Sequence, residues 1–238
     1  MKPTCRVLAV LILSGNISQV SAALDPPYPG GLRQCVLDVD SCSTDLVVCE
    51  AEVSNFANYA PVPQTGQKFC ADVDGRSISC AGTGQDGELQ TGVVWPTIRF
   101  IDNADGTIAD NLTRLVWLKN ADCFGLRTWA QALTDASNLQ SGQCGLSDGS
   151  VSGSWRLPNV RELHSLVSYG NANPALPQFN WFTGFSAEPY WTSTSLTFNN
   201  FLAYTVDFFV GFVDRDAKEA GEFTGGEPHR VIFVRTGP

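Results

Sequence analysis

The chain has 238 residues, of which 43% are hydrophobic and 16% are charged. It is long and apolar enough to bury a core, which excludes an intrinsically disordered protein. Its formal net charge of −9 opposes nonspecific binding to nucleic acid or to an anionic membrane surface, so we expect neither partner.

The N-terminus has the pattern of a secretory leader. Lys2 and Arg6 form a basic start, residues 7–13 are apolar, and residues 20–22 (Val-Ser-Ala) supply a small-residue cleavage site. The apolar run is far shorter than the ~20 residues that a membrane-spanning helix needs, and no later segment is long and apolar enough. We therefore predict a signal peptide over residues 1–22 and a secreted, periplasmic or cell-surface protein, with an uncleaved anchor as the alternative.

Residues 23–62 are predicted to form an N-terminal extension, bounded by proline-rich breaks. The extension holds three evenly spaced cysteines, Cys35, Cys42 and Cys49. Zinc sites use closer ligand pairs of the Cys-x-x-Cys kind, which are absent, so we expect one disulfide and one spare thiol that could pair between chains. The domain proper is predicted over residues 63–238.

Four later cysteines predict two disulfides, because an oxidising compartment preserves them. Cys70 and Cys80 bracket an Asp-Gly turn, so the two thiols can face each other across a short hairpin. Cys123 and Cys144 flank a predicted helix and its return loop, and closing that loop would stabilise the fold by roughly 3 kcal/mol. We pair Cys70 with Cys80 and Cys123 with Cys144.

The segment before that helix predicts two or three antiparallel strands. Residues 99–101 and 107–109 flank an Asn-Ala-Asp-Gly turn, and residues 115–118 follow. A helix-loop-helix calcium loop needs an oxygen ligand at its first position, where Gly106 would place Ile101. We therefore favour a hairpin turn and predict no metal and no cofactor.

Two capped helices follow, and several strands come after them. Thr128 with Gln131 forms a capping box before the first helix. Asn159 with Glu162 does the same for the second, which Gly170 is expected to end in a left-handed conformation. The later strands are predicted at 190–193, 204–208, 211–214 and 230–234. Two helices with several short antiparallel strands predict a disulfide-stabilised α+β domain.

Several motifs in order carry a family resemblance. They are residues 102–113, 144–150, the Trp155-Arg156-Leu157-Pro158 unit with Glu162, residues 189–195 and residues 231–235. Together they resemble the Lcl C-terminal domain family, named after the C-terminal domain of a bacterial collagen-like adhesin, over residues 63–238. The resemblance implies a secreted or surface protein. The named member is trimeric and binds sulfated polysaccharides, so the resemblance also implies a homo-oligomer, a trimer, whereas the acidic charge argues against a sulfated ligand.

The Trp-Arg-Leu-Pro unit followed by a late aromatic strand and a terminal strand is also similar to C-type-lectin-like folds, including formylglycine-generating enzymes. Those enzymes use a cysteine pair late in the fold, whereas the last cysteine here is Cys144. Calcium-dependent lectins place Glu-Pro-Asn or Gln-Pro-Asp before Trp-Asn-Asp, and Glu188-Pro189-Tyr190 keeps only two of these residues. We therefore expect the C-type-lectin-like fold with neither chemistry.

The residues with chemical potential point to binding. His164 and His229 are the only histidines, and neither has a second histidine at ligand spacing, so no catalytic residue is predicted. Sugars bind where aromatic faces lie beside amides and carboxylates. The candidate ligand-binding residues chosen on this basis are Tyr190, Trp191, Asn199, Asn200 and Asp207. Packing in a core is the competing interpretation for the rings, because alternation turns half of them inward.

The sequence therefore predicts a non-enzymatic extracytoplasmic binding module that recognises a glycan or a surface protein in adhesion. A secreted enzyme of unknown reaction on the same scaffold and a structural component of the cell envelope are the alternatives.

Overall fold

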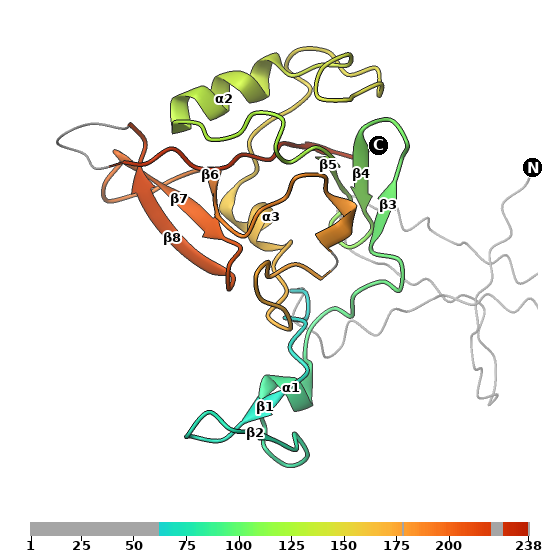
Figure 1. Ribbon diagram of the computed structural model, residues 1–238, viewed down its shortest axis with the longest axis vertical. Coiled ribbons are helices and arrows are strands. Elements are labelled where there is room, and N and C mark those ends of the chain that lie inside the picture. The colour runs from blue at the N-terminus through green and yellow to red at the C-terminus, as the bar shows by residue number, and fades with distance from the viewer. Residues whose placement is uncertain (1–61, 178, 220–225, 238) are drawn as a thin grey trace, which may run out of the picture. The chain divides into compact units, whose positions relative to one another are not determined.

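The computed structural model describes residues 62–177, 179–219 and 226–237. The predicted signal peptide and Cys35, Cys42 and Cys49 of the extension lie outside the described residues. Helices and strands follow one another along the chain as Figure 1 shows: β1 (Cys70–Ala71), β2 (Ser77–Ile78), α1 (Asp86–Leu89), β3 (Phe100–Asp102), β4 (Thr107–Asp110), β5 (Leu115–Leu118), α2 (Trp129–Asn138), α3 (Val160–His164), the 3-10 helix η2 (Phe179–Trp181), β6 (Pro189–Ser195), β7 (Leu202–Asp207), β8 (Phe212–Ala217) and β9 (Val234–Thr236). The predicted α+β class is confirmed. None of the helices in the described part of the chain is long and apolar enough to cross a membrane.

The strands form three antiparallel sheets. β1 pairs with β2, β3-β4-β5-β9 form a four-stranded sheet, and β6-β7-β8 form a three-stranded sheet. The last strand, β9, lies at the edge of the four-stranded sheet and pairs with β5, with Val116 opposite Arg235. The terminal strand therefore begins later than the 230–234 predicted, because residues 231–233 run to β9 outside any ladder.

The hairpin between β3 and β4 has the predicted turn. Asp105 Oδ1 accepts a hydrogen bond from the Thr107 backbone N–H (3.0 Å), and Gly106 adopts a φ of 87°. A Cβ at Gly106 would collide with the Gly145 carbonyl, so only glycine fits. Turn chemistry and this close approach account for the Asp-Gly pair.

Both predicted helix caps are confirmed. Thr128 accepts from the Gln131 N–H while Gln131 accepts from the Thr128 N–H. Asn159 Oδ1 accepts from two first-turn amides at 2.9 Å, and Glu162 Oε2 accepts from the Asn159 N–H at 2.8 Å. These reciprocal bonds satisfy amides that a helix N-terminus otherwise leaves open.

The second helix is shorter than predicted, and the role given to Gly170 is wrong. α3 ends at His164, and Leu166 and Val167 continue it only as turns with bonds to the third residue back. Gly170 is not left-handed. A side chain there would meet the Gly66 carbonyl, so glycine is required by the close approach of another segment.

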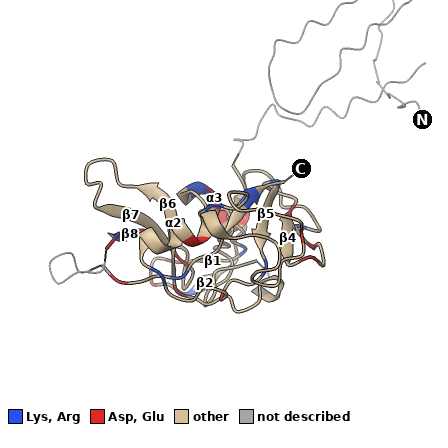
Figure 2. Cartoon of the chain, turned by 90° about the horizontal axis from the view of Figure 1, so that it is seen from above, with Lys and Arg blue, Asp and Glu red and all other residues tan. Residues whose placement is uncertain are grey.

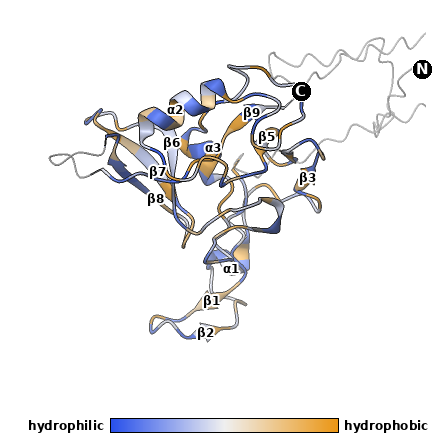
Figure 3. Cartoon of the chain, turned by 45° about the horizontal axis from the view of Figure 1, so that its top comes forward, coloured by the Kyte–Doolittle hydropathy of each residue, from blue (hydrophilic) through white to orange (hydrophobic). Residues whose placement is uncertain are grey.

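Two hydrophobic clusters form the core. The first gathers residues of α3, β3–β5, Tyr190 and Val206, and the second gathers residues of α2, β5 and Trp191. Successive residues leading into β9 contribute side chains to the two clusters in turn. Ile232 and Val234 pack in the first cluster, and Val231 and Phe233 pack in the second. Figure 3 shows hydrophobic colour on β5 and β9, and hydrophilic residues on the outer turns of α2.

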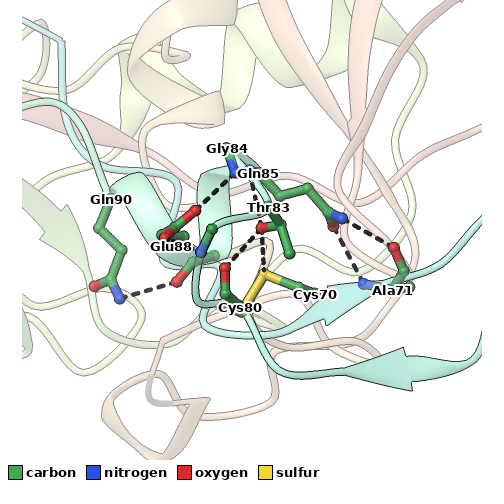
Figure 4. The surroundings of a disulfide bond; sticks show 10 residues. Cys70, Ala71, Cys80, Thr83, Gly84, Gln85, Glu88 and Gln90 are labelled. Atoms are coloured by element: carbon green, nitrogen blue, oxygen red, sulfur yellow. Dashed lines mark hydrogen bonds between the residues drawn. A yellow bond between two sulfur atoms is a disulfide. The ribbon is translucent and has the colours of Figure 1, made fainter.

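Both predicted disulfides are present, with Cα atoms 5.2 Å apart for Cys70–Cys80 and 5.6 Å apart for Cys123–Cys144. The first one lies in a small unit of β1, β2 and α1 (Figure 4). Thr83 donates to the Cys80 carbonyl (2.8 Å), and Glu88 accepts from the Gly82 and Gly84 amides. Covalent and polar links therefore hold this unit together.

Candidate functional site

The two aromatic rings predicted to contact a ligand lie in the core. Tyr190 and Trp191 are fully buried on opposite faces of β6. Tyr190 stacks on Phe185 with ring centres 4.7 Å apart, and Trp191 Nε1 donates to the Arg127 carbonyl (2.8 Å). The prediction of a binding surface at these rings is corrected, because β6 is covered on both sides and leaves neither ring a free face. The packing interpretation holds for both.

The three polar candidates do not meet either. Asn199 and Asn200 lie in the turn before β7, whereas Asp207 ends that strand. A six-residue strand spans about 20 Å, so one small ligand cannot contact both ends. Asn199 Oδ1 accepts from the Phe201 N–H (3.2 Å) and Asp207 Oδ1 from the Phe209 N–H (2.7 Å), which gives each a local role in its turn.

Asp207 lies in a pocket beside β7 and β8, which we call the β7–β8 pocket. Its lining residues are Pro189, Thr205, Asp207, Phe212, Asp214, Arg215, Asp216 and His229. Cross-strand pairing of Asp207 with Phe212 and of Thr205 with Asp214 brings these side chains to one sheet face. The pocket is small, about 140 Å³, so it suits one edge of a ligand that extends beyond it.

Charge in this pocket is mostly negative. Three carboxylates, Asp207, Asp214 and Asp216, face one guanidinium and one imidazole. Asp216 Oδ2 lies 2.8 Å from His229 Nε2 and also accepts from the Glu227 N–H. Over the rest of the domain, basic and acidic residues are interspersed (Figure 2). The pocket is therefore an acidic spot that would attract neutral or positively charged groups and repel anions.

A family model for the Lcl C-terminal domain matches residues 106–231, more than half of the chain. The chain belongs to the Lcl C-terminal domain family. The family suggests an extracellular domain, and two disulfides are consistent with such a location. No curated protein and no solved structure matches the chain. All residues of the β7–β8 pocket fall within the matched part of the Lcl C-terminal domain.

The most distinctive motif of this Lcl C-terminal domain has a structural role. Arg156 Nη1 and Nη2 each donate to Glu162 at 2.6 Å, in the bidentate geometry that suits guanidinium and carboxylate. Burial raises the pKa of Glu162, but the hydrogen bonds from Arg156 and from the Asn159 N–H outweigh it and leave the pKa below its ordinary value. The ion pair thus fixes the carboxylate that caps α3.

Both histidines are hydrogen bonded to a neighbouring side chain. His164 Nε2 lies 2.8 Å from the Tyr169 hydroxyl, and burial lowers the pKa of His164. The His229 ring hydrogen bonds to Asp216 and packs against the edge of Trp191. Within the described ranges, no serine, threonine or cysteine side chain hydrogen bonds to either ring, and no group of three or more His, Cys, Asp or Glu residues could hold a metal ion.

Sequence reasoning missed Phe212, the exposed ring of the pocket. It begins a strand in which Phe212, Asp214 and Asp216 alternate with Val213 and Arg215. That alternation of one aromatic and two acidic residues on one face is the signal that could have found the site. The predicted strand ended at residue 214, so it did not include Asp216 and the full alternation was not recognised.

Proposed function

We propose that this Lcl C-terminal domain is a non-enzymatic, extracytoplasmic binding module that recognises a glycan in adhesion through the β7–β8 pocket. The observation that carries the proposal is the Phe212 ring, which is 66% exposed and lines a pocket with three carboxylates. Sugars combine apolar C–H faces with hydroxyl donors, so an exposed ring beside acceptors matches their chemistry.

The charge of the pocket selects among glycans. Asp207 and Asp214 would accept hydrogen bonds from sugar hydroxyls or from an amino group, whereas sulfate or carboxylate groups would meet like charge. This supports a neutral or amino-substituted glycan, and the acidic chain as a whole supports it too. A surface protein that presents a basic side chain to Phe212 is the other partner that this charge favours.

The C-type-lectin-like scaffold is part of the same proposal. It is supported by the terminal strand β9, which returns beside β5, and by a separate late sheet, β6–β8, that carries the pocket. The homo-oligomer implied by the family resemblance stays a prediction, which light scattering on the purified protein would test.

The test is a glycan array with purified, oxidised protein, followed by calorimetric titration of the best neutral or amino sugar. Phe212→Ala should weaken binding about two- to tenfold, the range for loss of one ring contact. Asp207→Asn keeps the side-chain oxygen that accepts from Phe209 and removes only the charge, so it should weaken an amino sugar more than a neutral one.

Phe198→Ala is the matched control. Phe198 is 85% exposed and lies in the turn at the far end of β7. If Phe198→Ala abolishes binding while Phe212→Ala does not, the site is at that turn. Consumption of the sugar during the titration would favour the enzyme over the binding module.

A further inference from the structure

A second pocket lies beside the C-terminal strand β9, and residues of two family motifs, 144–150 and 231–235, line it. We call it the C-terminal pocket. It is lined by Asp148, Gly149, Ser150, Ser154, Arg235 and Thr236. Its volume is about 460 Å³, within the range of small-molecule sites, and every side chain in its lining is polar.

Asp148 and Ser150 form a fixed acceptor layer in this pocket. The Asp148 side chain is fully buried, and its Oδ1 accepts from the Ser150 backbone N–H (3.2 Å) and hydroxyl (2.7 Å). The Ser150 hydroxyl also accepts from Trp155 Nε1 at 3.0 Å. A buried carboxylate held in this way cannot turn away from the pocket without breaking those bonds.

Arg235 lies above this layer with most of its donors unused. Its guanidinium is 5.5 Å from the Trp155 ring centre, and Nη2 is 3.3 Å from Asp148 Oδ2. Arg235 Nε and Asp148 Oδ2 are buried without a hydrogen-bond partner among the described residues. The side chain is 25% exposed, so the remaining guanidinium donors are open to the pocket.

We infer that the C-terminal pocket binds the vicinal diol of a neutral saccharide. The exposed edge of Arg235 donates to one hydroxyl oxygen, while the Ser154 hydroxyl donates to the neighbouring one. The proposal does not depend on the β7–β8 pocket, because no lining residue is shared.

The charge balance favours a neutral ligand over an anion. Asp148 neutralises Arg235 at 3.3 Å, so a sulfate or carboxylate in the pocket would meet a balanced pair and a buried negative charge. A diol needs donors and acceptors side by side and brings no charge to desolvate. The exposed part of the Arg235 guanidinium supplies donors, and the Ser154 hydroxyl beside it can also accept.

The experiment follows the Trp155 indole N–H signal by NMR on the full chain during titration with methyl mannoside. Ligand contact with Arg235 changes the cation above the Trp155 ring, so this signal should shift saturably. Arg235→Lys should weaken binding about tenfold or more, because an ammonium lacks the planar donor fork. Ser154→Ala should weaken it about two- to tenfold, because it removes a hydroxyl that lines the pocket. Ser154 Oγ also accepts from the Val151 N–H (3.1 Å), so the denaturation midpoint of this variant is measured beside its affinity.

Arg161→Lys, an exposed arginine on α3, is the matched control and should change nothing. Glycerol should bind more weakly than methyl mannoside if the diol belongs to a saccharide. Equal affinity for the two would overturn the assignment of a saccharide as the ligand. The fully O-methylated mannoside, in which every hydroxyl group is capped by a methyl group, has no hydrogen-bond donor and should not bind. Any of three results would overturn the proposal. They are the absence of a saturable shift, a larger shift with sulfate alone, and an unchanged affinity in both pocket variants.

Discussion

The segment 62–98 and the domain from residue 99 onward reach order by different means. In residues 62–98 the large hydrophobic side chains that the structure places are exposed or half-buried, such as Phe69 and Val73, and a disulfide joins Cys70 of β1 to Cys80, which follows β2. After residue 99, two apolar clusters bury Trp117, Tyr190 and Trp191 completely. A short segment that cannot bury a core of its own is thus held by covalent and polar bonds instead.

The largest effect is expected in the second region. Trp191→Ala should lower the free energy of unfolding by roughly 3–5 kcal/mol, because it removes a fully buried ring and its hydrogen bond to Arg127. Chemical denaturation measures this, and Phe198→Ala, which removes an exposed ring, serves as the control with little change. A small effect of Trp191→Ala would mean that this ring does not contribute to the core. The domain after residue 99 would then not differ from residues 62–98 in what stabilises it.

Removing each disulfide sharpens the contrast. Replacing Cys123 and Cys144 by serine should cost roughly 3 kcal/mol on the chain-entropy model and lower the midpoint of the whole domain. The same change at Cys70 and Cys80 should speed hydrogen exchange in residues 62–98 and leave the exchange of β5 unchanged. If both double variants lower the global midpoint equally, the two regions unfold as one.

The cap of α3 gives a smaller effect. Asn159→Ala should cost roughly 0.5–2 kcal/mol, because it leaves the Arg161 and Glu162 amides without their acceptor. The denaturation midpoint should fall at unchanged slope, and Asn159→Asp, which keeps the acceptor, should restore it. An unchanged denaturation midpoint in Asn159→Ala would show that the cap does not contribute to the stability of the domain after residue 99.

The smallest effect is a pH dependence at Glu162. Its folded pKa lies below the unfolded value of about 4.3, so its contribution to stability is present above that pH and is lost as the pH falls through the folded pKa. The Arg156–Glu162 pair is partly exposed, which limits the contribution to about 1 kcal/mol or less. Glu162→Gln should reduce the loss of stability below pH 4, measured by thermal unfolding. If the stability of Glu162→Gln depends on pH in the same way as that of the unchanged protein, Glu162 does not cause the loss of stability in acid.

The features that the sequence predicted correctly depend on residues close together in the chain. The Thr128 and Asn159 caps, the turn at Gly106 and both disulfides follow from spacing of a few residues to about twenty. The pairing of β9 with β5 and the burial of β6 on both faces depend on distant segments. Periodicity therefore could not show that Tyr190 and Trp191 are both covered, one by each cluster.

The candidate site was predicted only in part for the same reason. Asp207 lies in the β7–β8 pocket, but its neighbour Phe212 comes from the next strand and His229 from beyond it. Cross-strand register decides which side chains meet, and one sequence does not state the register. α3 was predicted too long because Ser165 donates its hydroxyl to the Glu162 carbonyl, a local competitor that the apolar spacing does not reveal.

The alternation of residues 231–234 between the two clusters also couples the two halves of the core. Ile232 and Val234 pack in one cluster while Val231 and Phe233 pack in the other, so four consecutive residues serve both. A slip of this segment by one residue would turn each side chain toward the wrong cluster. The segment therefore keeps the two clusters in register, and loosening one of them should loosen the other.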